Sequence, residues 1–572
     1  MTTSLPLQPC WLLDLPGELK LNIISHLDRR RDLYHLSRTC RILEDVTMRR
    51  LYHNVDVEVP SRSARTVGSR ALRAPVTQSM RDLTVRNGAM IRKRNDTHIR
   101  RRRSDAGTAE DFVHDILDKV PTNQLKRFAF LHPAPMQAQM LEVLTRRHNY
   151  TLKHLAFYEL ESSPQGNLSP KTLQSLECHN INEGESLVRL LCENKGTLER
   201  LRLGQERHLI DEYHRNKLGF LENLPQPHES FFTSAYSLDN LPRLRELSLH
   251  GLSLDMLRPD SIPQALFFCQ LEKLTLESCP GSAELLESIA GTFHWVSSSP
   301  DAPRSPAVSP SLKHFFFRHE QPTNALKDSM VRFLASFVGL ESLSLLFENA
   351  TFLERPSALI AEHGRTIRTL VLESRIQPRE HLSIDTSRPF GVGGYSQDIW
   401  EESINDIASL CPNIVELGIG FPWNNEIVRL RRTLLPTLQH LRTIHIRNFP
   451  ENQVFSQLGD YTIKEYATKF VEWVFPALVG RNRPALEHLA MGPTLYESRW
   501  KMGPNIASSG AGTQSQQRQL PEFLRTHHFA LDWAKTRFGR WSPLITPVSE
   551  KLMEEMCDRK PLAGVFEQVW LK

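Results

Sequence analysis

A short hydrophobic pattern recurs along the middle of the chain: an apolar residue, two variable residues, a second apolar residue, one variable residue and a third apolar residue. Thirteen copies lie between residues 80 and 491, and they begin 21 to 28 residues apart, or 41 to 47 apart where a copy is missing or carries an insertion. The alternation at the end of each copy predicts a strand with one buried face. The copies are Met80-Leu83-Val85, Leu125-Phe128-Phe130, Leu152-Leu155-Phe157, Leu173-Leu176-Cys178, Leu198-Leu201-Leu203, Leu244-Leu247-Leu249, Leu271-Leu274-Leu276, Leu312-Phe315-Phe317, Leu340-Leu343-Leu345, Ile367-Leu370-Leu372, Ile414-Leu417-Ile419, Leu441-Ile444-Ile446 and Leu486-Leu489-Met491.

The segments between these strands have helical spacing, as at residues 185–193, 283–289, 326–338 and 404–410. The period is that of leucine-rich repeats, whose single units cannot bury their apolar face alone and therefore stack. The sequence thus predicts an α/β fold: a curved leucine-rich-repeat solenoid over residues 80–496, with a parallel concave sheet and outer helices. Other residues stand where regular repeats carry asparagine after the strand, so uneven curvature is expected. The predicted loops are residues 204–240, 295–310 and 376–396.

The apolar pattern near the N-terminus is helical. Ile23, Ile24 and Leu27 form one stripe, and Leu33, Leu36, Cys40 and Leu43 form another that Asp32 is placed to cap. A unit of roughly 40 residues is close to the size at which a hydrophobic core becomes marginal. We therefore expect part of its apolar surface to contact another protein or the next domain.

Five ordered pairs give this segment a more specific signature: Leu15-Pro16, Glu18-Leu19, Asp32-Leu33, Cys40-Arg41 and Leu51-Tyr52. The segment resembles the F-box, a three-helix domain, and we place it at residues 9–56. The resemblance implies binding to a Skp-type adaptor and, through it, to a cullin scaffold that carries a ubiquitin-conjugating enzyme. The alternative is an amphipathic helical hairpin that only caps the next domain. The adaptor-binding residues implied by the resemblance are Leu15, Pro16, Leu19, Ile23, Ile24, Leu27, Leu33 and Leu36.

The remaining segments follow from changes in composition. Residues 57–79 are predicted to be a linker, and residues 497–519, rich in Ser, Gly and Gln, a disordered low-complexity segment. Apolar residues return in 520–572, with helical spacing at 520–524 and alternation at 529–533. We expect this last segment to cap the open end of the solenoid.

Charge is concentrated in one place. The formal net charge is +5, but residues 91–103 carry seven basic residues against Asp96, so the rest of the chain is near −1. Such a local patch differs from the broad basic footprint of nucleic-acid-binding domains, which makes nucleic acid an unlikely partner. The patch is interpreted as a nuclear-localisation signal, a solvated loop or a site for an acidic substrate tail, and its residues are Arg92, Lys93, Arg94, Arg100, Arg101, Arg102 and Arg103.

Several classes of protein are disfavoured. The sequence shows no secretory signal and no apolar stretch of membrane-spanning length, and its eight cysteines are scattered, so we expect an intracellular protein of the nucleus or cytoplasm with no membrane partner. It also lacks the motifs of nucleotide-binding, zinc-dependent and nucleophilic enzymes. We therefore predict no catalysis, no cofactor and no metal.

The concave sheet is the expected site for a protein substrate. The residue between the last two apolar positions of each copy is predicted to face away from the core. Arg202, Phe316 and His445 are the large side chains chosen from this row as tentative substrate-binding residues. The predicted function is that of a non-catalytic substrate-recognition subunit of a cullin-based ubiquitin ligase. The alternatives are an F-box protein that acts with the adaptor outside any ligase, and a leucine-rich-repeat scaffold.

Overall fold

The structure is a computed structural model, and it divides into two compact units, Met1–Leu244 and Arg245–Lys572. We describe each unit by itself. The residues that the structure describes are 11–27, 30–59, 74–87, 102–132, 135–161, 170–181, 184–204, 241–254, 267–298, 310–319, 322–348, 356–375, 406–419, 438–447, 463–474, 485–492, 526–537, 539 and 541–548. Over these ranges, no helix is both long enough and apolar enough to span a bilayer.

The first unit begins with four short helices: α1 (Trp11–Asp14), α2 (Gly17–Ser25), α3 (Arg30–Ser37) and α4 (Arg41–Leu51). Pro16 directly precedes α2 with φ −54°, the angle to which its ring restricts it. Asp32 was expected to cap α3, but it lies within the first turn, where its charge still favours the positive end of the helix dipole. Ile24, Leu33 and Leu43 are the buried apolar side chains of this bundle.

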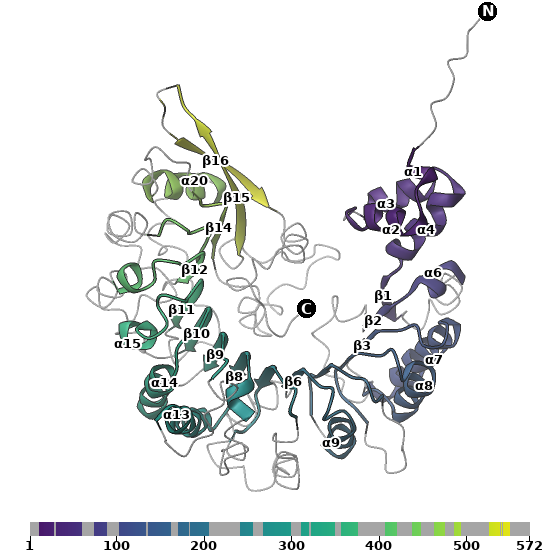
Figure 1. The fold of residues 1–572 in the computed structure, drawn as a ribbon, viewed down its shortest axis with the longest axis horizontal. Coiled ribbons are helices and arrows are strands. Elements are labelled where there is room, and N and C mark those ends of the chain that lie inside the picture. Colours follow the sequence, from purple (N-terminus) through teal and green to yellow (C-terminus); the bar gives the residue numbers. More distant parts are fainter. Residues whose placement is uncertain are drawn as a thin grey trace, which may run out of the picture. The chain divides into compact units, whose positions relative to one another are not determined.

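A parallel sheet follows in the same unit. Its strands are β1 (Asn54–Val59), β2 (Asp82–Asn87), β3 (Arg127–Leu131), β4 (His154–Phe157), β5 (Ser175–Cys178) and β6 (Arg200–Gly204), paired in chain order. The intervening helices are α6 (Ala74–Ser79), α7 (Arg102–Lys119), α8 (Ala138–His148) and α9 (Gly184–Glu193). Helices α7, α8 and α9 lie on one side of this sheet (Figure 1). Phe128, Phe130 and Phe157 are fully buried between the two layers.

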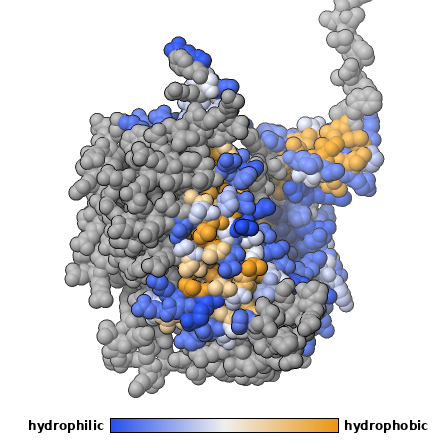
Figure 2. Space-filling model, turned by 60° about the vertical axis from the view of Figure 1, so that its left-hand side comes forward, coloured by the Kyte–Doolittle hydropathy of each residue, from blue (hydrophilic) through white to orange (hydrophobic). Residues whose placement is uncertain are grey.

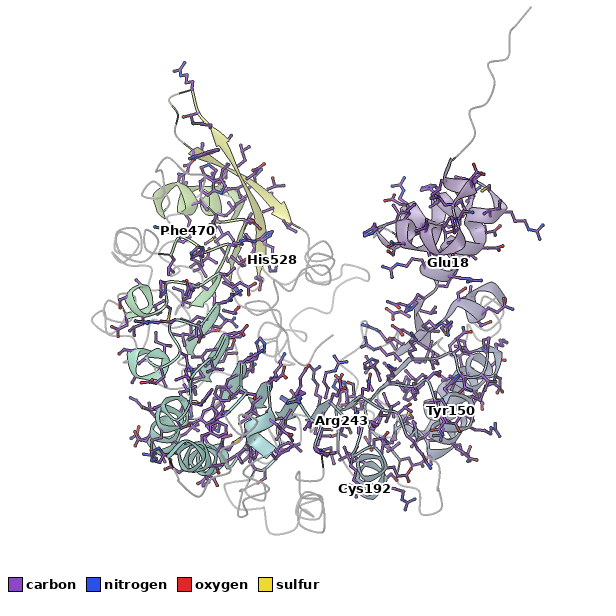
Figure 3. All side chains as sticks on the ribbon, in the orientation of Figure 1. Glu18, Tyr150, Cys192, Arg243, Phe470 and His528 are labelled. Atoms are coloured by element: carbon purple, nitrogen blue, oxygen red, sulfur yellow. The ribbon has the colours of Figure 1, made fainter. Side chains whose placement is uncertain are left out.

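The second unit continues the same alternation. Its strands are β7 (Glu246–His250), β8 (Lys273–Glu277), β9 (His314–His319), β10 (Ser342–Glu348), β11 (Thr369–Arg375), β12 (Glu416–Ile419), β13 (Thr443–Ile446), β14 (His488–Met491), β15 (His527–Lys535) and β16 (Trp541–Val548). Its helices are α13 (Ser282–Ser298), α14 (Asn324–Ala335), α15 (Pro356–Ile360) and α20 (Ile463–Val474), and residues 406–410 are also helical. Pairing is parallel from β7 to β14 and antiparallel from β14 to β16. Phe470 lies on α20 at one side of the sheet, and His528 lies on β15, a strand of the sheet (Figure 3).

Side chains from one repeat satisfy the backbone of the repeat before it. Thr197 Oγ1 donates to the carbonyl of Leu173 at 2.8 Å, and Asn194 Oδ1 accepts from the amide of Leu173 at 3.0 Å. Leu340 is held in the same way: Thr366 Oγ1 donates to its carbonyl at 2.7 Å, and His363 Nδ1 accepts from its amide at 3.4 Å. We call such side-chain bonds to the backbone of the preceding repeat a clamp. The threonine bond recurs from Thr151 to Leu125 and from Thr172 to Leu152, each at 2.9 Å. These bonds fix the stacking of repeats because the first apolar residue of each clamped copy is buried and its polar backbone needs a partner.

All thirteen repeated patterns coincide with strands, from β2 to β14, and the predicted helices match α9, α13, α14 and residues 406–410. The alternation at 529–533 lies in β15. Strands β1 and β16 were not predicted. The predicted helical spacing at 520–524, the segment 497–519 and most of the three predicted loops lie outside the described residues, and Trp295 to Ser298 belong to α13 instead of a loop.

Candidate functional site

The four N-terminal helices expose five large apolar side chains. Their exposed fractions are 48% for Leu19, 38% for Leu21, 45% for Ile23, 48% for Tyr34 and 51% for Ile42. Only three other large apolar side chains in the described parts of the chain are as open: Tyr150, Val338 and Leu544. Figure 2 shows the hydrophobic surface that gathers over these helices. We call Leu19, Leu21, Ile23, Tyr34 and Ile42 the apolar patch.

The spacing along α2 explains this exposure. Leu19 and Ile23 are four residues apart, so they share one face of the helix. Lys20 and Ile24 form the neighbouring line, which is buried against the bundle. The Nζ of Lys20 donates to the carbonyl of Leu13 at 2.7 Å and so ties the end of α1 to α2. The bundle is too small to cover both lines, and burying a side chain such as Ile23 against a partner contributes about 1.5 to 3 kcal/mol.

The eight predicted adaptor-binding residues divide into three groups. Pro16, Leu19 and Ile23 are exposed, whereas Leu15, Leu27 and Leu36 are half-buried. Ile24 and Leu33, at 0% and 3% exposure, pack inside the bundle, so the structure does not present them as a free surface. These two side chains hold the helices together instead.

Three members of the apolar patch were missed by the sequence analysis. Leu21, Tyr34 and Ile42 lie off the main apolar stripes, and so the search for one stripe per helix passed over them. The signal that could have found them is the excess of large apolar side chains over what so small a bundle can bury.

The profile of the F-box-like family matches residues 12–58, which contain the apolar patch. No curated protein sequence matches the chain significantly. The N-terminal helices therefore form an F-box-like domain, a type of domain that indicates a substrate-recognition role in ubiquitin ligase complexes. This match covers the first part of the chain, and the repeated sheet lies almost entirely outside it.

The open face of the sheet is less accessible than the sequence predicted. The side chain of His445 is 0% exposed, and its Nε2 lies 2.8 Å from the carbonyl oxygen of Gly492. The expectation that His445 faces solvent is therefore wrong, because this histidine bonds the backbone of a distant segment. Phe316 is half-buried and packs against Leu346 and Val371, so it also has a packing role.

Arg202, the third tentative substrate-binding residue, lies in an ionic group on β5 and β6. Its Nη1 is 3.1 Å from Oε1 of Glu177, and Nε2 of His179 is 2.9 Å from the same oxygen. Burial alone raises the pKa of Glu177, but the hydrogen bond from His179 and the charge of Arg202 outweigh it and lower that pKa to about 2. Glu177 is therefore ionised at neutral pH, and the side chain of Arg202 remains 32% exposed.

The second unit buries its charges more deeply on the equivalent face. Arg447 and Glu373 form an ion pair in which each side chain is 5% exposed. His250 Nδ1 lies 3.7 Å from Oε2 of Glu277, and both residues are buried. Removing one partner of such a pair leaves an uncompensated charge, so these pairs restrict the local structure of the sheet.

The described residues offer little nucleophilic or metal-binding chemistry. Burial raises the pKa of Cys269 to about 11 and the pKa values of Cys279 and Cys411 to about 12, so these thiols stay protonated. Within the described ranges, no group of three or more His, Cys, Asp or Glu side chains is arranged to hold a metal ion. In the basic patch, residues 92–101 lie outside the described part, as do the side chains of Arg102 and Arg103 in α7.

Proposed function

We propose that the chain is a non-catalytic substrate-recognition subunit of a Skp-cullin-F-box ubiquitin ligase. The observation that carries this proposal is the apolar patch on a domain that matches the F-box-like family. A Skp-type adaptor covers the patch, and the adaptor links the chain to a cullin scaffold.

We propose further that the repeated sheet is a leucine-rich-repeat solenoid that binds the protein substrate. The repeat period, the parallel strands in chain order and the clamps made by Thr197 and Thr366 support this interpretation. Holding adaptor and substrate on one chain raises the effective concentration of a substrate lysine near the ubiquitin-conjugating enzyme. Proximity of this kind accelerates transfer without a catalytic group in this subunit.

The proposal is tested by co-purification of the tagged full chain with the adaptor and the cullin. Leu19→Arg with Ile23→Arg places two charges in the apolar patch, and we expect it to abolish adaptor binding because both charges would be desolvated at the interface. Val338→Arg is the matched control, since Val338 is 66% exposed outside the patch. Unchanged adaptor binding by the double variant would refute the assignment.

The wild-type result separates the proposed function from its alternatives. Recovery of adaptor and cullin supports the ligase subunit, and recovery of adaptor alone supports a role outside any ligase. Recovery of neither supports a scaffold whose N-terminal helices cap the repeat. We also propose that the chain works in the nucleus or cytoplasm and that the basic residues at 92–103 act as a nuclear-localisation signal.

A further inference from the structure

A group of cationic side chains on strands β3 to β6 outnumbers the acids beside it, where Asp82 stands in register with Arg127. Arg127, His154 and Arg200 occupy equivalent positions on the open face: Arg127 pairs in register with His154, and Ser175 stands between His154 and Arg200. Both arginines are exposed, and His154 is half-buried. In the described part of the chain, neither Arg127 nor Arg200 forms an ion pair with a carboxylate.

The contact between Arg200 and His154 shows the local excess of positive charge. Nη2 of Arg200 lies 3.3 Å from Nδ1 of His154. A guanidinium group only donates, so Nδ1 accepts this bond and the imidazole is neutral. Burial first, then the charges of Arg200 and Arg127, lowers the pKa of His154; Lys153 acts in the same direction, and Asp82 opposes them.

Small side chains and an aromatic pair lie next to this group. Ala129 and Ala156 stand two residues further along β3 and β4, and both are buried, with 1% and 7% of their surface exposed. Tyr158 and His179 stack beyond them, with ring centroids 6.5 Å apart. Over β2 to β6 this face carries four arginines, at 86, 127, 200 and 202, against the acids Asp82 and Glu177.

We propose that the face of β3 to β6 binds an acidic segment of a protein partner, with Arg127 and Arg200 as the anion-binding pair. The two guanidinium groups offer forked donors that match a carboxylate or a phosphate group. An anion held by either arginine would add negative charge near His154 and favour protonation of its ring. The interleaved acids Asp82 and Glu177 favour a protein segment over a nucleic acid, whose binding sites carry a larger and more uniform positive charge.

This inference deepens the proposed function, because it names the chemical class of the substrate that the repeat would recognise. Arg202 already forms an ion pair with Glu177. We therefore assign the anion of the partner to Arg127 and Arg200, which form no ion pair in the described part of the chain. Salt should weaken the interaction, since both arginines are open to solvent.

The test measures fluorescence anisotropy with the full chain and three labelled probes: hexaglutamate, a glycine-rich peptide with several phosphoserines, and a single-stranded oligonucleotide. Arg127→Gln with Arg200→Gln should weaken binding of the peptides by about tenfold or more, as expected for the loss of charge-assisted hydrogen bonds. Arg146→Gln with Arg243→Gln is the matched control, because it removes two exposed arginines of the same unit from outside the group. The control should stay within about twofold of wild type.

A second readout follows His154 directly. The ring resonance of His154, assigned with His154→Gln, should report a higher pKa when a peptide probe is bound, and this shift should disappear in Arg127→Gln with Arg200→Gln. Binding of either peptide with both effects supports the proposal, and the preferred peptide distinguishes carboxylate from phosphate. The proposal is overturned if neither peptide binds, if the double variant binds them as wild type does, or if the oligonucleotide binds more tightly than both peptides.

The same variants keep this inference separable from the proposed function. Arg127 and Arg200 lie outside the F-box-like domain, so their double variant should still co-purify with the adaptor. If this double variant loses peptide binding but keeps the adaptor, the result reports on the anion site alone. If the wild-type chain does not bind the adaptor, the result counts against the ligase role.

Discussion

His363 makes the second unit sensitive to acid, and this sensitivity can be tested with one substitution. The ring is fully buried and contacts Phe337, with ring centroids 4.7 Å apart. Its Nδ1 accepts from the amide of Leu340, and its Nε2 lies 2.8 Å from the carbonyl oxygen of Leu334. Because a carbonyl only accepts, Nε2 carries the proton and the ring is neutral. A second proton on Nδ1 would meet the amide N–H of Leu340 and break the clamp.

The magnitude follows from the pKa. Burial is the largest cause that lowers the pKa of His363 from 6.5 to about 4, and it outweighs the bond to Leu334. The unfolded chain therefore takes up a proton more readily than the folded chain below pH 6.5. The contribution to stability is complete above that pH. It falls by about 2 kcal/mol at about pH 5 and is lost as the pH passes through about 4, a total of about 3 kcal/mol.

His363→Asn separates the clamp from its titration. Asn194 occupies the equivalent position in the first unit, where its Oδ1 accepts from the amide of Leu173 and its Nδ2 donates to the carbonyl of Leu190 at 2.9 Å. Of the two bonds that His363 makes, an asparagine should therefore keep the one from the Leu340 amide, and it cannot titrate. His363→Leu should lose both and cost about 2 to 5 kcal/mol at neutral pH, because it leaves two buried backbone groups unpaired.

The assay measures the free energy of unfolding of the second unit by urea denaturation at several pH values. Hydrogen exchange of the Leu340 amide is measured alongside it. We expect His363→Asn to lose about 2 kcal/mol less stability than wild type between about pH 7.5 and pH 5. His148 and His528, whose pKa values are also lowered to about 4, remain in both proteins and supply the shared acid response. Equal pH dependence of wild type and His363→Asn would refute the reasoning.

Three further outcomes are expected. Thr197→Val should lower the free energy of unfolding of the first unit by about 1 to 3 kcal/mol in urea titrations, because the buried carbonyl of Leu173 loses its hydroxyl donor; an unchanged midpoint would remove the clamp from the stacking argument. Leu15→Ala with Pro16→Ala should abolish adaptor binding in pull-downs while circular dichroism of the repeat stays unchanged, and retained binding would count against the F-box interface. Replacing Arg100 to Arg103 with Ala should shift a fluorescent fusion toward the cytoplasm, and an unaltered distribution would favour the solvated-loop interpretation.

The repeated strands were predictable because their signal is local and occurs many times. Strand β1 carries the same pattern as Tyr52-Val55-Val57, and Val55 pairs in register with Leu83. This copy overlaps the end of the F-box-like segment, whose closing pair is Leu51-Tyr52. Strand β16 was not predicted either: it contains Pro543 and Pro547, which lower strand propensity except at the edge of a sheet.

The contacts of individual polar side chains were not predictable in the same way. His445 is buried by a bond to Gly492, 47 residues further along the chain, and no local pattern encodes that distance. Asn194 and His363 each accept a hydrogen bond from a backbone amide of the preceding repeat although their side chains differ, so composition at that position does not reveal this bond. The roles become visible only when the partner atoms are placed, which requires the fold.

The two candidate surfaces differ in chemistry, and this difference follows from how each part of the chain is built. The F-box-like bundle is small, so apolar side chains such as Leu19 and Ile23 remain outside its core. The sheet has a deep core on its helical side, which leaves its other face free to carry charged residues such as Arg127 and Arg200. Binding at the first surface depends on apolar burial and binding at the second on charge, so rising salt should weaken only the second. Under the proposed function, one chain would hold a constant adaptor through apolar burial while it exchanges acidic partners through charge.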